Sequence, residues 1–123
     1  QPNGHSLIEE SHVSNLLAEL ASEVQTARLT AYWVASMHAN GEHPEGESTL
    51  VTLVMRETAR KIDAAALDLL GPYANLWRGS KWAPLDGEMS YNYINNTYFS
   101  FAAGGFDISR NVIANRGLQL PRG

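Results

Sequence analysis

The chain of 123 residues contains no cysteine, so disulfides, thiolate metal sites and cysteine nucleophiles are all excluded. It is also short of basic charge, with nine Lys and Arg against thirteen Asp and Glu and a formal net charge of −4. This balance provides no basic field for counterion release from nucleic acid, which excludes nucleic acid as a partner. The absence of cysteine suits a reducing compartment, and the expected location is the cytoplasm.

Long hydrophobic runs are missing as well. The longest apolar stretches, such as 64–67 and 99–103, are far too short to span a bilayer. The N-terminal residues are polar and lack the basic and apolar segments of a signal peptide. A chain of this length can bury one core without covalent links. We therefore expect a soluble single domain with no membrane partner.

Motifs for hydrolytic or metal chemistry are not found either. Ser100 and Ser109 have no nearby histidine to activate them, and no nucleophile elbow occurs. The four histidines are scattered through polar segments. Glu9 and His12 share a helix face by spacing, but such a pair is a weak metal motif. The prediction is that the chain holds no metal.

The spacing of apolar residues predicts four helices. The first begins at a capping box of Ser6 and Glu9, extends over roughly thirty residues, and ends at Asn40-Gly41. The second begins at Ser48 and ends abruptly at Gly71-Pro72.

Glu57 and Lys61 on this second helix are four residues apart, so we expect them to pair on its outer face. The third helix is expected around 91–101, although the composition of 91–99 suits a strand equally well on propensity. The fourth runs from Asp107, a good cap or first-turn acid, to Gly117. Four helices with short or medium connections favour an all-α, antiparallel four-helix bundle.

The segment 71–87 differs from a flexible linker, because aromatic residues alternate there with glycine and proline. We expect a structured loop with aromatic anchors. A second loop contains Gly104-Gly105 and opens directly into the fourth helix. A glycine pair is most often a plain turn that needs positive φ. In front of a helix it also lets an anion meet free backbone N–H groups.

Three segments carry a family resemblance. The end of the chain reads Ile-x-Arg-Asn-x-Ile-Ala from Ile108, followed by Arg-Gly-Leu-x-Leu-Pro-Arg over 116–122. The segments 17–32 and 66–74 match less specific patterns, a long helix with an Ala-Arg pair and a glycine-containing turn. Together they resemble the C-terminal helical domain of the acyl-CoA dehydrogenases, closest in pattern to actinobacterial members. The resemblance extends over nearly all of 1–123 and implies a fragment or partial chain whose first helix is missing.

The resemblance implies an FAD-dependent α,β-dehydrogenation of an acyl-CoA thioester, in which a carboxylate removes the α-proton while a hydride moves to the flavin. Ala103 occupies the position where many members carry the catalytic Glu, so this chain supplies no catalytic residue there. The resemblance assigns cofactor contacts to Asp68, Gly71, Gly104, Gly105 and Asp107. Gly105 replaces a Thr hydroxyl, and Asp68 places a charge where the family has a neutral amide.

Two functions from different classes follow from this resemblance. The first is the C-terminal domain of a dehydrogenase that contributes flavin-side and subunit-interface contacts, acts on acyl-CoA only within a complete homo- or hetero-oligomer, and is inactive in isolation. The second is a structural subunit of a heteromeric acyl-CoA dehydrogenase that has lost flavin binding. Both differ from a third possibility, an unrelated four-helix bundle.

The aromatic residues of the second half of the chain have two possible roles. They either line an acyl pocket or complete a core or an interface, which is the more common use of such a cluster. The set concerned is Trp77, Trp82, Tyr91, Tyr93, Tyr98, Phe99 and Phe101.

Overall fold

The computed structural model describes residues 4, 6–102 and 104–121. Four α-helices and no strand occur in this part of the chain: α1 (Ser11–Ala39), α2 (Glu45–Leu70), α3 (Glu88–Ala102) and α4 (Gly105–Val112). A π-helical turn, Ile113–Gly117, continues α4. The prediction of an all-α, four-helix protein is confirmed, and residues 91–101 are helical rather than extended.

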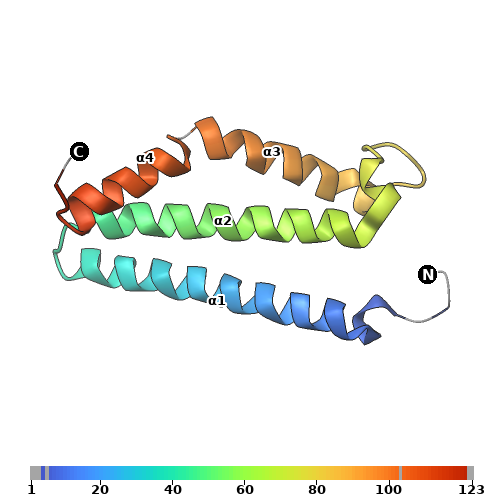
Figure 1. Cartoon of the computed structure of the whole chain (residues 1–123), viewed down its shortest axis with the longest axis horizontal. Coiled ribbons are helices and arrows are strands. Elements are labelled where there is room, and N and C mark those ends of the chain that lie inside the picture. The colour runs from blue at the N-terminus through green and yellow to red at the C-terminus, as the bar shows by residue number, and fades with distance from the viewer. Residues whose placement is uncertain (1–3, 5, 103, 122–123) are drawn as a thin grey trace.

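The helices are arranged around α2, which lies in the middle of the molecule (Figure 1). α1 runs antiparallel to α2 along one side, and α3 and α4 lie nearly end to end along the other side (Figure 1). Two seams therefore hold the molecule together, one between α1 and α2 and one between α2 and the α3–α4 pair. The bundle is open, because α2 separates α1 from the other two helices.

The apolar core is small and lies mainly in the seam between α1 and α2. Its buried apolar side chains are Val13, Ala27, Val34, Leu53 and Ala65. The side chain of Thr58 on α2 is also buried. Many large apolar side chains remain exposed, because helices in an open row have no second layer against which to bury them.

The seam between α2 and α3 contains polar groups. The buried carboxylate of Asp63 on α2 accepts a hydrogen bond of 2.6 Å from the Asn96 amide on α3. Ser100, one turn further, is also buried and donates to the Asn96 carbonyl at 2.7 Å. α3 thus turns a polar side toward α2, and within the described part of the chain each buried side-chain polar atom has a hydrogen-bond partner.

The opposite side of α3 is apolar. Tyr91, Ile94, Tyr98 and Phe101 recur at helical spacing, and Tyr98 and Phe101 are 64% and 78% exposed. We call these four residues the α3 stripe. The periodicity that predicted this helix was therefore correct, but the stripe faces away from α2.

The predicted starts of the first two helices are wrong. Ser6 makes no capping hydrogen bond with its side chain, and Leu7–Glu9 forms a separate 3-10 turn before α1 begins at Ser11. α2 begins at Glu45 rather than at Ser48, since Pro44 provides the first helical carbonyl for the Ser48 amide. The predicted stop at Gly71 is confirmed, because φ there is +54°.

The predicted pair between Glu57 and Lys61 does not form. Lys61 Nζ instead lies 2.5 Å from Glu23 on α1, and Glu57 accepts a 2.8 Å hydrogen bond from Arg110 on α4. Lys61 thus pairs with a residue of α1, and Glu57 pairs with a residue of α4. These two interactions join α2 to both of its neighbours.

The segment between α2 and α3 is structured by its own contacts, as predicted. The Asp86 carboxylate accepts a hydrogen bond from the Gly79 amide at 3.0 Å, and the Arg78 guanidinium lies 4.1 Å from the centre of the Tyr91 ring. Trp77 packs edge-to-face on the same ring. Among the described residues, no helix is long and apolar enough to cross a membrane.

A close backbone contact fixes the C-terminal turn on α2. A Cβ added at Gly46 would lie 2.7 Å from Gly117 N, whereas a Cβ added at Gly117 would approach Gly46 no closer than 3.5 Å. The contact therefore needs glycine on the α2 side only.

We predict that Gly46→Ala lowers the free energy of unfolding by about 1–3 kcal/mol, because the new methyl group has to push the turn away. Urea denaturation measures this loss. The matched control is Gly117→Ala, which should stay within about 0.5 kcal/mol of the parent. Equal stabilities for the two variants would contradict the packing described.

The ion pair between α1 and α2 predicts a pH dependence. The hydrogen bond to Glu23 raises the pKa of Lys61, and nearby Glu19 and Glu57 raise it further. A raised pKa in the folded state means that the stabilisation is complete below the ordinary lysine pKa and is lost as pH rises through the raised value. Glu23→Gln should therefore destabilise the protein at pH 7, and the difference from the parent should shrink above about pH 10.4.

Urea denaturation across this pH range tests the pair, with Glu42→Gln in the exposed turn between α1 and α2 as the control. A destabilisation by Glu23→Gln that is the same at neutral and alkaline pH would show that the pair is not its source.

Candidate functional site

The predicted cofactor residues form two separate clusters. Gly104, Gly105 and Asp107 lie at the junction of α3 and α4, beside the middle of α2, because the ring of Phe106 is 5.2 Å from the Arg60 guanidinium. Asp68 follows Arg60 by eight residues on the same helix, which is about 12 Å along the axis. The second cluster, Asp68 and Gly71, is thus at the C-terminal end of α2.

The junction of α3 and α4 depends on its two glycines. Gly104 has φ +98° and Gly105 has φ +57°, a region that side chains other than glycine rarely adopt. No side chain caps α4, so its first-turn N–H groups are not occupied by a capping residue. A Cβ added at Gly105 would meet no atom within 4 Å. Among the described residues, space therefore remains beside Gly105 for a ligand.

Asp107 is the first-turn acid that the sequence predicted, but it does not cap the helix. Its side chain is 97% exposed, and its carboxylate lies 3.5 Å from the Arg110 guanidinium. An acid in this position interacts favourably with the helix dipole and competes with any second anion. Arg110 offsets part of its charge.

Two cationic side chains lie beside the junction. The guanidinium groups of Arg60 and Arg110 lie 5.2 Å and 5.9 Å from the centre of the Phe106 ring. Arg110 is paired with Glu57, whereas Arg60 has no ion-pair partner among the described residues. An open groove of about 490 Å³ adjoins them, lined by Glu57, Arg60, Lys61, Ala64 and Tyr93. First-turn amides without a side-chain cap and a guanidinium without an ion-pair partner among the described residues suit a phosphate or another anion.

The cluster at the end of α2 has the opposite electrostatic character. Asp68 is exposed, and the helix C-terminus presents carbonyl groups with partial negative charge. Gly71 has positive φ and open space at its Cβ position. This end suits hydrogen-bond donors of a ligand rather than a phosphate.

The structure describes no dry carboxylate at the junction. Ala103, the position expected for a base in many relatives, lies outside the described residues. The side chains of Glu57 and Asp107 are 42% and 97% exposed, and both interact with Arg110. An abstracting base requires a carboxylate held close to a bound substrate. Neither of these two exposed groups meets that requirement in this chain.

Most of the aromatic side chains do not converge on a pocket. Only Tyr93 lines the groove beside the junction, and the α3 stripe points outward. Trp77 and Trp82 are also exposed. Of the two interpretations of these residues, an interface fits this exposure better than a closed acyl pocket.

Sequence reasoning did not find Arg60 and Phe106. They are 46 positions apart in the sequence, and only the packing of α4 on α2 brings them together. No pattern within either helix connects them. In the described residues, no three His, Asp or Glu side chains gather closely enough to hold a metal ion.

The family of the chain follows from comparison with known proteins. The model of the acyl-CoA dehydrogenase C-terminal domain matches residues 1–118. The chain therefore belongs to the acyl-CoA dehydrogenase family, a family of FAD-dependent oxidoreductases. No curated protein sequence matches it significantly.

Solved structures agree on the fold. The structure described as "Tcur3481-Tcur3483 steroid ACAD", where ACAD abbreviates acyl-CoA dehydrogenase, superposes with a TM-score of 0.87 at 21% identity over 99% of this chain. A variant of the same actinobacterial (Thermomonospora) protein gives a TM-score of 0.85 at 22% identity, again over 99% of this chain. The chain covers only 31% and 32% of those two chains.

Proposed function

We propose that the chain is the C-terminal helical domain of an FAD-dependent enzyme that dehydrogenates an acyl-CoA thioester between the α and β carbons. In that enzyme it provides flavin-side and subunit-interface contacts, and the catalytic base comes from elsewhere. The observation that carries the proposal is the uncapped N-terminus of α4 behind Gly104 and Gly105. The match to the family model over 1–118 supports it.

The residues at the junction fit part of an FAD molecule. The first-turn amides of α4 and the free Arg60 guanidinium suit its phosphate groups, and the missing Cβ at Gly105 leaves room for close approach. The negative charge of Asp107 weakens this fit, and the nearby Arg110 guanidinium offsets part of that charge. When bound, FAD supplies the hydride acceptor. The chain's own contribution is to position that cofactor through backbone groups.

The second cluster would contact a second flavin, which a neighbouring subunit holds. Asp68 accepts hydrogen bonds from N–H or O–H donors, and Gly71 allows close approach at the end of α2. The family places this turn against the flavin of a neighbouring subunit. The opposite electrostatic character of the two clusters supports contact with different chemical groups, and the family arrangement favours two different flavins.

The exposed α3 stripe supports assembly with another subunit, either identical or different. The structural relatives belong to a hetero-complex, and we favour an arrangement of that kind. The acyl-CoA substrate would reach the active site only in this assembly. We place the assembly in the cytoplasm, in line with the composition.

One pair of residues favours the alternative function. Asp68 and Asp107 place exposed carboxylates on both loops that would face a flavin. A domain with these charges that binds no flavin would be a structural subunit of a heteromeric acyl-CoA dehydrogenase. Flavin content of the purified complex distinguishes this alternative from the proposal.

The decisive variant is Gly105→Ala in the complete natural protein, purified with any co-expressed partner. We expect flavin affinity to fall about tenfold, because the methyl group strains the left-handed turn and intrudes on the cofactor side. Visible absorbance during flavin titration measures the loss.

Gly41→Ala is the matched control, since Gly41 also has positive φ and open space but lies in the turn between α1 and α2. Gly41→Ala should lower the free energy of unfolding about as much as Gly105→Ala does, and it should leave flavin affinity unchanged. Equal flavin affinities in both variants would contradict the assignment of Gly105. A complex that binds no flavin at all would leave the structural alternative in place.

The chain alone should show no dehydrogenase turnover, because it lacks a dry carboxylate at the junction among its described residues and covers less than a third of its structural relatives. Reduction of an artificial electron acceptor in the presence of acyl-CoA tests this expectation. Turnover by the isolated polypeptide would refute it.

A further inference from the structure

A buried carboxylate lies between α2 and α3, outside both predicted cofactor clusters. Asp63 is 5% exposed, and its Oδ2 accepts a hydrogen bond of 2.6 Å from Nδ2 of Asn96. None of the described Lys, Arg or His side chains forms an ion pair with Asp63. A neutral amide is therefore the side-chain partner that the structure gives to this carboxylate.

A carboxylate in this position lowers the stability that the seam could have. It loses its hydration on burial, and a neutral amide compensates for less of that loss than a cation would. Well-packed apolar side chains of similar volume often stabilise a protein as much as a buried pair that contains a charge, or more. Stability alone therefore does not account for Asp63 and Asn96.

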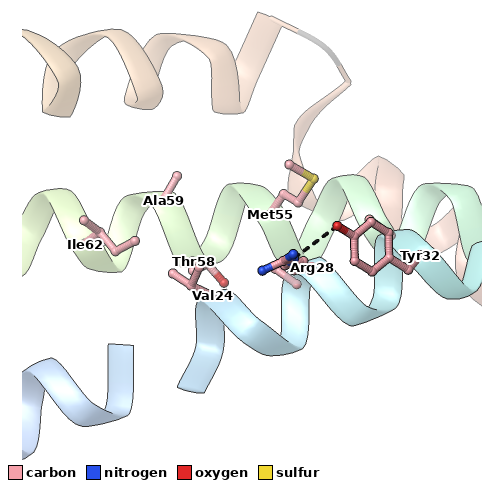
Figure 2. Close-up of a pocket in the computed structure, with 9 residues that line it drawn as sticks. Val24, Arg28, Tyr32, Met55, Thr58, Ala59 and Ile62 are labelled. Atoms are coloured by element: carbon pink, nitrogen blue, oxygen red, sulfur yellow. Dashed lines mark hydrogen bonds between the residues drawn. The ribbon is translucent and has the colours of Figure 1, made fainter. Parts of the chain in front are cut away.

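The α1 side of α2 shows that apolar packing is enough to hold a helix there. Val24 of α1 and Met55 and Ile62 of α2 line an almost wholly apolar groove of about 390 Å³ along that seam (Figure 2). The seam with α3 instead buries Asp63 and Ser100. A buried polar pair adds one preferred register between two helices, because any other register leaves a buried polar group without its partner.

Asp63 belongs to a row of three side chains on α2. Glu57, Arg60 and Asp63 follow one another at intervals of three residues, which places them on neighbouring turns along one side of the helix. Glu57 accepts a hydrogen bond from Arg110 on α4, and the Arg60 guanidinium lies 5.2 Å from the centre of the Phe106 ring at the start of α4. Asp63 binds α3. The row thus attaches both helices that meet at the glycine pair to one side of α2.

The link between α3 and α4 is short. Only two residues separate α3, which ends at Ala102, from α4, which begins at Gly105. If α3 slipped by one helical turn along α2, its end would move by about 5.4 Å. Two residues span at most about 7 Å when fully extended, so they cannot absorb such a shift without moving the start of α4. The register of α3 therefore determines where the glycine pair stands.

We propose that Asp63 and Asn96 are positioning residues for the cofactor site. Their hydrogen bond fixes the register of α3 on α2, and this register places the glycine pair and the start of α4 where they meet the cofactor. The inference rests on the proposed function, because it takes the junction of α3 and α4 as a flavin contact. It adds two residues that belong to neither cofactor cluster.

The test uses two double variants of the complete natural protein, purified with any co-expressed partner. Asp63→Asn with Asn96→Asp exchanges the two groups and keeps a hydrogen bond between a carboxylate and an amide, so flavin affinity should stay within about twofold of the parent. Asp63→Ala with Asn96→Leu removes the bond and keeps the summed side-chain volume similar. Its flavin affinity should fall at least about tenfold, although its urea midpoint should stay close to that of the parent.

Two single variants separate positioning from stability. Val34→Ala removes buried volume from α1, so it should lower the urea midpoint and leave flavin affinity unchanged. Asn95→Leu places the same leucine one position away on α3, at a side chain that forms no hydrogen bond within the described part of the chain. This variant should also leave flavin affinity unchanged.

The register itself can be measured without flavin. The 123-residue chain has no cysteine, so Thr52→Cys on α2 and Phe99→Cys on α3 provide two specific sites for spin labels. Both positions are exposed. Pulsed electron spin resonance should give one narrow distance distribution for this labelled chain and for its exchanged double variant. The distribution should shift or broaden in the apolar double variant.

An unchanged label distance in the apolar double variant would overturn the inference, and so would a changed distance together with parental flavin affinity. Equal losses of flavin affinity in Val34→Ala and in the apolar double variant would overturn it as well, because the pair would then act through stability. A parent complex that binds no flavin would contradict the proposed function instead. The label distances would in that case still decide whether the pair sets the register.

Discussion

The packing of α2 between two rows of helices is the constraint on which the rest of the molecule depends. α1 covers one side of α2, and α3 with α4 covers the opposite side (Figure 1). Because no helix of the described chain closes this row into a ring, the two broad faces stay open to solvent. The small buried core and the many exposed apolar side chains are consequences of this arrangement. A domain built in this way is suited to bury its faces against other parts of a larger assembly.

The same arrangement positions the two clusters that we propose as cofactor contacts. α4 starts beside the middle of α2, where two guanidinium groups lie near the Phe106 ring and no side chain caps the helix N-terminus. The turn at Gly71 lies further along α2 and presents the negative end of a helix. In the proposed function, one chain thus contributes two partial cofactor contacts of opposite electrostatic character. Each needs material from another part of the enzyme to become a complete site.

Local features of this fold were predictable from the sequence, because they depend on residues close together in the chain. Gly71-Pro72 predicted the end of α2, and the spacing of Tyr91, Ile94 and Tyr98 predicted a helix. The direction in which that helix faces was not predictable. It depends on the hydrogen bond between Asn96 and Asp63, which are separated by 33 residues.

Charged residues show the same limit. The rule for residues four apart predicted a Glu57–Lys61 pair. In the structure Lys61 pairs with Glu23, which is 38 residues away, and Glu57 pairs with Arg110, which is 53 residues away. The glycine pair at the junction was predictable as a possible anion site, whereas the position of Arg60 beside it was not.

The most direct test of the account is an experimental structure of the complete natural protein with its partner and FAD. We expect backbone groups at Gly105 to contact one flavin and the turn at Gly71 to contact another. A bound flavin with no atom of this domain near it would contradict the account.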